Sequence, residues 1–351
     1  MKLLVCSDRL SLRGGADQHL LAVASALDAD LTWAIGRDAD VPAEGRRVRV
    51  RGLASSGPDE RLDGLSRLAA DADVVLAQNV VNPVALEQLA ATGKLVVTVQ
   101  DHRVFCPGPG RTLPDGALCR VPMSDAACTA CLPSDSYRER LLALTRARLE
   151  ALRGARRVLV LSRYMQVELE AAGIASDVVP PWVEVSRSPV AGRGFVVGGR
   201  LVAHKAPQVA SEACRLAGAK LSIAGAGRLT DELEGEQLGW LANEDLRALL
   251  HASRALLFVG RWQEPFGILG VEALAEGTPV VVGASGGVED WADAGCVRVP
   301  PGDVEATAEA IRALRDDPER ALELGRRGQA MVRERFTRAR WLPRLLELLV
   351  S

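Results

Sequence analysis

The chain has 351 residues, of which 48% are hydrophobic and 25% charged, and its formal net charge is -2 at pH 7. This composition excludes a disordered chain, and the length favours two domains of ordinary size. Nucleic-acid binding is excluded too, because it needs a basic excess or a basic, aromatic-rich face. No apolar run reaches the ~18 residues that a membrane-spanning helix requires, and the opening MKLLVCSDRL is too short for a signal peptide. We therefore expect a cytoplasmic globular protein.

Short apolar segments alternate with helical patterns along the first half of the chain. Strands are predicted at 2–7, 73–79, 94–100 and 156–162, and helices over Ala16–Leu27, Pro83–Ala91 and Tyr164–Ala172. Continuous apolar strands separated by helices are typical of a parallel sheet that is covered on both faces. Residues 1–180 are therefore expected to form a doubly wound, Rossmann-like domain.

The same alternation starts again after VVPPWVEVSRSPVAGRG, a stretch whose prolines and glycines suit a linker. Strands are predicted at 195–200, 219–225, 254–260, 278–283 and 296–300, and the tail is almost entirely helical. This pattern indicates a second doubly wound domain over 181–335 and a terminal helix over 336–351. Ligands of open α/β sheets bind at the carboxyl ends of the strands, so two such domains should face a central cleft.

Glycines and cations follow the first strand of each predicted domain. Gly14 and Gly15 precede a helix, where they let the backbone approach an anion or a sugar, although glycine is also the ordinary residue of a tight turn. Gly199, Arg200 and Lys205 follow the apolar part of FVVGGRLVAHK. Two such cations can neutralise a diphosphate without a bound metal.

A second polar group lies in RWQEPFGILGVEALAEGTPVVVGASGGVED. Glu264 stands in the loop before a helix predicted to begin near Ile268, and Glu272 lies about one turn into that helix. Both carboxylates can therefore point to one ligand while the first helical N–H groups offer it donors. Upstream, the backbone around Gly239–Leu241 is where a nucleotide base could be bound and recognised.

These motifs resemble those of the retaining, nucleotide-sugar-dependent glycosyltransferases of family 4, which have the GT-B fold. The resemblance is strongest over 195–336, and EPFGILGVEALAEGTPVVV is its most specific element. It implies an α/β protein of two Rossmann-like domains, with the acceptor on the first and the donor on the second. It also implies that the final helix, in RARWLPRLLELLV, crosses back onto the first domain.

The resemblance assigns roles to individual positions. Arg200 and Lys205 would bind the donor diphosphate, Glu264 the transferred sugar and Glu272 the ribose. The remaining donor-binding positions implied are Gly14, Gly15, Gly199, Leu241, Phe266, Gly267, Ile268 and Leu269. The implied activity is transfer of a hexose from a nucleoside diphosphate sugar, with UDP or GDP as the expected nucleotide, to an unidentified acceptor, and no cofactor is required for catalysis.

The sequence departs from the family pattern at the end of the strand in VTVQDHR. A His-Asp pair is usual there, but Gln100 holds the histidine position, with Asp101 matching and His102 following. Either Gln100 or His102 could bind the donor sugar, and we favour Gln100 slightly. The usual glycine after the lysine is Ala206, and the usual acidic turn reads GGVED.

Three other functions fit parts of the sequence. A GT-B relative that isomerises a nucleotide sugar, such as a 2-epimerase, would share the nucleotide-binding half but would need acid and base groups from the first domain, and this chain has only four histidines. A non-catalytic nucleotide-sugar-binding protein would tolerate the loss of Arg200 or Glu264. A nicotinamide oxidoreductase is disfavoured, because no G-x-G-x-x-G motif follows the first strand.

Four of the seven cysteines lie in one loop-like stretch over 100–135. Cys106, Cys119, Cys128 and Cys131 have the spacing C-x12-C-x8-C-x2-C, which would suffice for a structural zinc site and less readily for an iron–sulfur cluster. Reduced thiols in an irregular loop and disulfide or redox chemistry are the alternatives. Structural zinc is the favoured prediction.

Overall fold

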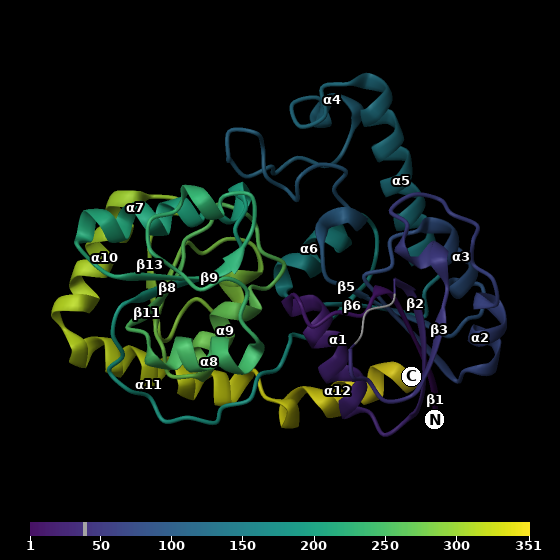
Figure 1. Cartoon of the computed structure of the whole chain (residues 1–351). Coiled ribbons are helices and arrows are strands. Elements are labelled where there is room, and N and C mark those ends of the chain that lie inside the picture. The colour runs from purple at the N-terminus through teal and green to yellow at the C-terminus, as the bar shows by residue number, and fades with distance from the viewer. Residues whose placement is uncertain (38–40) are drawn as a thin grey trace. The chain divides into compact units, whose positions relative to one another are not determined.

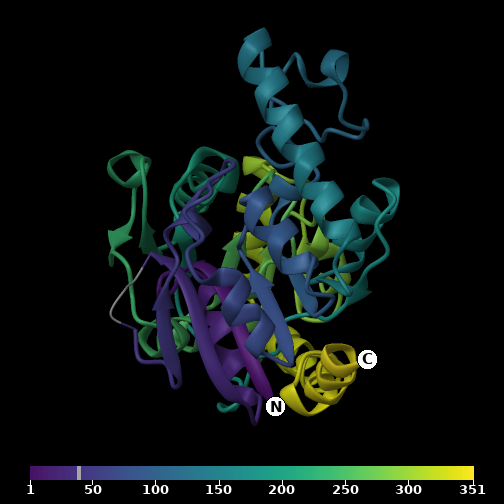
Figure 2. The ribbon, with the colours of Figure 1, turned by 90° about the vertical axis from the view of Figure 1, so that its right-hand side faces the viewer.

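The computed structural model describes residues 1–37 and 41–351. Their contacts divide the chain into two compact units, which we call unit 1 (Met1–Pro180 with Leu342–Ser351) and unit 2 (Pro181–Trp341). Each unit is a layered α/β structure (Figures 1 and 2). Among the described residues, none of the helices combines the length and apolarity needed to span a membrane.

Unit 1 contains a seven-stranded parallel sheet in the order β3-β2-β1-β4-β5-β6-β7. The strands are β1 (Lys2–Arg9), β2 (Asp30–Arg37), β3 (Arg46–Arg49), β4 (Val74–Gln78), β5 (Leu95–Val99), β6 (Arg157–Val160) and β7 (Asp177–Val178). The helices of its main part are α1 (Gly15–Ala26), α2 (Leu65–Asp71), α3 (Pro83–Ala90), α4 (Asp125–Cys128), α5 (Asp135–Arg153) and α6 (Arg163–Ala171). The strand order reverses between the neighbouring strands β1 and β4, and the carboxyl ends of these two strands therefore mark the topological switch point of the sheet.

Local sequence signals explain where several helices of unit 1 begin. The Asn82 side chain accepts a hydrogen bond from the Val84 N–H, and Pro83 occupies the first turn of α3. Ser162 caps α6 in the same way through the Met165 N–H. Such caps satisfy N–H groups that have no partner within the helix. Strands β4 and β5 are buried along their whole length, as expected for a sheet covered on both faces.

Unit 2 contains a six-stranded parallel sheet in the order β10-β9-β8-β11-β12-β13. The strands are β8 (Phe195–Arg200), β9 (Leu221–Ala226), β10 (Glu236–Gln237), β11 (Ala255–Phe258), β12 (Val280–Val282) and β13 (Cys296–Arg298). Helices α7 (Pro207–Ala217) and α10 (Val304–Asp316) pack together, as do α8 (Asn243–Ala252), α9 (Ile268–Ala275) and α11 (Pro318–Arg335) (Figure 1). The switch point of this sheet lies between β8 and β11.

The last helix, α12 (Arg338–Val350), belongs to unit 2 up to Trp341 and to unit 1 from Leu342 onward. Two contacts hold its end in unit 1. The Arg156 guanidinium donates to the Leu349 carbonyl, and Arg344 pairs with Asp177 at 3.0 Å. The chain therefore returns to the unit in which it began.

The predicted fold class is confirmed, since both halves are doubly wound parallel α/β units. Helix α9 begins at Ile268 as predicted, and β8 has the predicted bounds. Strands β2 and β3 and helix α5 were not predicted. The sequence of β3, RRVR, is exposed at the sheet edge and lacks the apolar run that marks the central strands. Helix α5 is rich in charged residues, which weakens its apolar signal.

Candidate functional site

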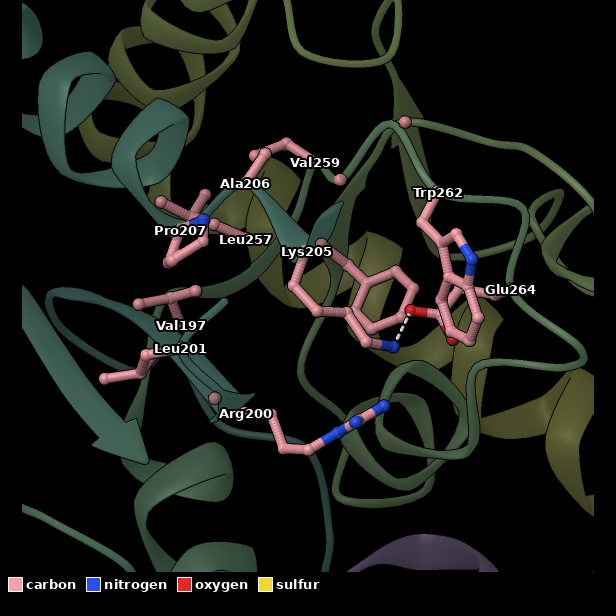
Figure 3. Close-up of a pocket in the computed structure, with 14 residues that line it drawn as sticks. Val197, Arg200, Leu201, Lys205, Ala206, Pro207, Leu257, Val259, Trp262 and Glu264 are labelled. Atoms are coloured by element: carbon pink, nitrogen blue, oxygen red, sulfur yellow. Dashed lines mark hydrogen bonds and ion pairs between the residues drawn. The ribbon is translucent and has the colours of Figure 1, made fainter. Parts of the chain in front are cut away.

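A pocket opens at the switch point of the unit 2 sheet, beside the carboxyl ends of β8 and β11 (Figure 3). Its cavity volume is about 30 Å³. The polar and aromatic side chains that line it are Arg200, Lys205, Phe258, Trp262 and Glu264, with Gly198, Gly260 and Gly283 supplying bare backbone. This is the place where ligands of open α/β sheets bind.

The pocket brings two predicted site residues into direct contact. The Lys205 ammonium donates to Glu264 Oε1, and the two form an ion pair. Lys205 follows β8 in a short 3₁₀ turn, whereas Glu264 lies in the loop after β11, so the sheet brings together residues 59 positions apart. Burial and the nearby Arg200 lower the pKa of Lys205, and the Glu264 carboxylate opposes this shift. The negative charge of Glu264 thus offsets part of the cost of burying the Lys205 ammonium.

The loop that carries Glu264 is fixed by backbone contacts. The Glu264 carbonyl accepts a hydrogen bond of 2.7 Å from the Gly287 N–H, and Glu264 forms a parallel bridge with Gly286. The Trp291 indole N–H donates to the Phe266 carbonyl at 2.6 Å. A Cβ at Gly286 would lie 2.6 Å from the Glu264 carbonyl oxygen, so the Gly-Gly turn is needed for this approach. The EPFG and GGVED motifs therefore form one structural element.

Helix α9 begins immediately after this loop. Gly267 precedes it with a φ of 84°, a conformation that suits glycine, and Ile268 and Leu269 form its first turn. Phe266 is buried, and its ring packs edge-on against Phe336. The first N–H groups of the helix provide donors beside Glu264.

The other predicted donor-side residues are not among those that line the pocket. Gly199 is in β8 with a φ of 100°, and Leu241 is half-buried in the loop before α8. Glu272 accepts a hydrogen bond of 3.3 Å from the Asn243 side chain, and burial raises its pKa. Glu264 and Glu272 thus flank the start of α9 but have different partners.

Unit 1 holds a second polar group at its own switch point and beside β5. Gly14 caps α1 with a φ of 115°, and Gly15 is the first residue of that helix. The buried Gln100 side-chain amide donates to His19 Nδ1 at 2.7 Å. Burial lowers the pKa of His19 to about 4, so the imidazole is neutral at pH 7. His19, which the sequence did not single out, thereby fixes the orientation of Gln100.

Asp101 and His102 follow Gln100 but have structural partners. Asp101 accepts hydrogen bonds from the backbone N–H and the side chain of Arg103, both at 2.8 Å. Burial raises the pKa of Asp101, yet Arg103 more than offsets this and the net pKa is lowered. His102 is buried, its Nε2 lies 3.0 Å from the Tyr164 hydroxyl, and its ring packs edge-on against Phe105.

The structure does not support the zinc prediction for Cys106, Cys119, Cys128 and Cys131. Among residues 1–37 and 41–351, no three His, Cys, Asp or Glu side chains are grouped so that they could hold a metal ion. Instead, the Cys119 and Cys131 thiols lie 3.9 and 3.8 Å from the carbonyl oxygens of Val121 and Thr112. All seven cysteines are free thiols.

Trp262, which lines the pocket, and His204, which packs against it, were not predicted from the sequence. The Lys205 ammonium lies 4.5 Å from the centre of the Trp262 ring, and the His204 ring lies 5.0 Å from the same ring. Burial, Lys205 and Arg200 together lower the pKa of His204 to about 4. Both residues are within a few positions of a strand end, a signal that could have identified them.

Residues 182–331 match the family described as Glycosyl transferases group 1. The chain is similar to a glycogen synthase of Mycobacterium tuberculosis, with 35% identity over 133 residues, which cover 34% of this chain and 31% of the synthase. It is also similar to the D-rhamnosyltransferase WbpZ of Pseudomonas aeruginosa, with 30% identity over 166 residues and 43% of each chain covered. The match thus spans less than half the length of either relative.

The fold of the chain is similar to that of Anabaena HepE in its complex with UDP and glucose. The TM-score is 0.73 at 19% sequence identity, and 99% of each chain is covered. The fold and the matched family agree with the resemblance seen in the motifs. The chain therefore has the GT-B fold, and its residues 182–331 match the group 1 glycosyltransferase family.

Proposed function

We propose that the chain is a retaining glycosyltransferase that moves a hexose from a nucleoside diphosphate sugar to an acceptor. The observation that carries this proposal is the convergence of Arg200, Lys205 and Glu264 at the switch point of unit 2, beside the start of α9. UDP is the first nucleotide to test because HepE binds UDP and glucose, and GDP is the second.

The reaction begins when the bond between the sugar and the diphosphate breaks, with an oxocarbenium-like transition state at the anomeric carbon. Negative charge then builds on the departing diphosphate, and Arg200, Lys205 and the first N–H groups of α9 stabilise it. The acceptor hydroxyl attacks from the face that the leaving group vacates and gives its proton to a phosphate oxygen. Retention then needs no nucleophile from the protein.

The carboxylates hold the non-reacting parts of the donor. Glu264 would accept hydrogen bonds from hydroxyls of the transferred sugar, and Glu272 from the ribose. Burial raises the pKa of Glu272, which means that its carboxylate has already lost part of its hydration. A ribose that binds there would therefore displace little further water from the carboxylate. Leu241 and the backbone near it would contact the base.

Unit 1 would supply the acceptor side and the group that replaces the family histidine. We assign that role to Gln100, because His19 orients its amide. The His102 ring, in contrast, already contacts the Tyr164 hydroxyl and the Phe105 ring. Asp101, held by Arg103, would act as a positioning residue for the segment after β5. Gly14 and Gly15 would leave room for the acceptor or the donor phosphates.

Binding of the nucleotide can be tested without knowledge of the acceptor. A ligand that binds only the folded chain raises its Tm, so UDP, GDP, ADP and dTDP should be compared by thermal shift. We expect one of them to raise the Tm and the matching nucleoside monophosphate to raise it less. If none of the four diphosphates changes the Tm, the proposed function is wrong.

Turnover can be tested through slow hydrolysis of the donor, in which water replaces the acceptor. Arg200→Ala and Lys205→Ala should each lower the rate of nucleoside diphosphate release by about 10²–10³, because each removes one donor to the developing charge. The product sugar should keep the anomeric configuration of the donor. A non-catalytic binding protein would bind the nucleotide but show no release above that of a heat-treated sample.

A further inference from the structure

Trp262 lies against the cation that would bind the donor. It stands two positions before Glu264 in the loop after β11 and is half-buried. The Lys205 ammonium lies 4.5 Å from its ring centre, within the range of a cation–π interaction. Figure 3 shows the Lys205 ammonium joined to the Glu264 carboxylate by a hydrogen bond, on the side of the pocket where the Trp262 ring lies.

His204 packs against the same indole. The two ring centres are 5.0 Å apart and the ring planes are tilted by 58°. Because His204 and Lys205 are consecutive, one short turn places a neutral imidazole and an ammonium on a single aromatic side chain. His204 thus holds the orientation of the Trp262 indole, and it belongs to the same turn as the Lys205 ammonium.

The Lys205 ammonium already has an anionic partner in the pocket. Lys205 and Glu264 both line the pocket and form an ion pair there (Figure 3). A diphosphate carries more negative charge than one carboxylate, so it competes with Glu264 for the ammonium at short range. An ion pair between Lys205 and the donor diphosphate therefore requires that the ammonium turn away from Glu264.

We propose that Trp262 is a positioning residue that keeps the Lys205 ammonium in the pocket while it turns from Glu264 to the donor diphosphate. This inference rests on the proposed function of the pocket. The indole face stabilises the cation without forming a directional bond, so the ammonium can move across it and keep a favourable contact. The same movement releases the Glu264 carboxylate to bind the sugar, which couples diphosphate binding to sugar binding.

The test compares diphosphate binding with nucleoside binding in Trp262 variants. Trp262→Leu removes the aromatic face but keeps an apolar side chain, and Trp262→Phe keeps a smaller ring. Calorimetric titration with UDP should show a Kd about 3- to 30-fold higher in Trp262→Leu and a smaller change in Trp262→Phe. Titration with uridine, which lacks the diphosphate, should give the same Kd in all three proteins.

A double-mutant cycle shows whether the effect passes through Lys205. In a Lys205→Met background, Trp262→Leu should cause no further loss of UDP affinity, because the cation that the ring positions is gone. Tyr137→Leu is the matched control, since Arg140 lies 5.2 Å from the centre of that ring, in unit 1. It should leave the Kd for UDP unchanged.

The outcomes separate this inference from the proposed function. If UDP, GDP, ADP and dTDP all fail to bind the wild-type chain, the proposed function fails and this inference with it. If a diphosphate binds and Trp262→Leu binds it as tightly as wild type, or loses diphosphate and nucleoside affinity equally, only the positioning role is overturned. Should Trp262→Leu fail to fold, Trp262→Phe and its cycle with Lys205→Met decide the question by the same criteria.

Discussion

Ala206 is held in a backbone conformation that alanine rarely adopts. Its φ and ψ are 49° and 48°, in the left-handed region, and it comes directly after Lys205 and before α7. A Cβ in this region lies too close to the backbone, at a cost of about 1–2 kcal/mol. In the family that the motifs resemble, glycine is usual here. The chain therefore keeps the turn that presents Lys205 despite a strained residue.

Replacing Ala206 with glycine should stabilise the protein. The relief of strain exceeds the extra conformational entropy that glycine has in the unfolded chain, so we expect the free energy of unfolding to rise by about 0.5–1 kcal/mol. Differential scanning calorimetry would show a higher Tm. Ala203→Gly is the control, because Ala203 is exposed and is not among the positive-φ residues of the described chain. That change should lower the Tm, and a lower Tm in both variants would contradict the strain argument.

The end of α9 is tied to α8 and to the segment that enters unit 2 by one buried carboxylate. Glu276 is fully buried and pairs with Arg187 at 2.9 Å and with Arg247 at 2.5 Å. Arg247 also donates to the Glu184 carbonyl at 2.8 Å. The helix whose first turn adjoins the pocket is thus anchored at its other end by ion pairs. The glutamate of the EGTPVVV motif has this structural role.

Glu276→Gln should destabilise unit 2 strongly. The variant keeps the shape of the side chain but leaves two arginines without their shared charge partner, and breaking a buried ion pair typically costs about 3–5 kcal/mol. We expect about 2–3 kcal/mol, because both arginine side chains retain some contact with solvent. Urea unfolding would measure the loss. The control Glu289→Gln removes an exposed pair with Arg298 and should cost less than about 1 kcal/mol. Equal losses in the two variants would show that Glu276 has no special role.

The stability of the whole molecule should depend on pH through His19 in unit 1. Burial lowers the pKa of His19 from its ordinary value of 6.5 to about 4. Between these values the unfolded chain binds a proton that the folded chain does not. The neutral imidazole therefore makes its full contribution to the free energy of unfolding above pH 6.5, and this contribution is lost as the pH falls towards 4.

His19→Asn should flatten this pH dependence. In the wild type the free energy of unfolding should fall by up to about 1.4 kcal/mol per pH unit across that window from this residue alone. Urea unfolding at about pH 7, 6 and 5 would measure the slope in both proteins, and the difference isolates His19 from the other titrating groups. The same slope in both would show that His19 titrates normally in the folded state.

Most of the fold could be predicted from the sequence, because the central strands are continuous apolar runs. These runs located β1, β4, β5 and β6 in unit 1 and β8, β9, β11, β12 and β13 in unit 2. The edge strand β3 escaped prediction because its exposed arginines carry no apolar pattern. The zinc site predicted for the four clustered cysteines is not supported among the described residues, because spacing along the chain does not report where the thiols point.

The sequence by itself determined the two α/β units, the motifs and several of the residues that line the unit 2 pocket, because strand periodicity and loop motifs are local properties of the chain. Only the tertiary structure decided which of those residues meet. In the structure Lys205 pairs with Glu264, and Trp262 lies beside the lysine. Glu272 accepts a hydrogen bond from Asn243, and Gln100 donates one to His19. These contacts join strand ends, loops and helices that are far apart in sequence, so the packing of these elements fixes them.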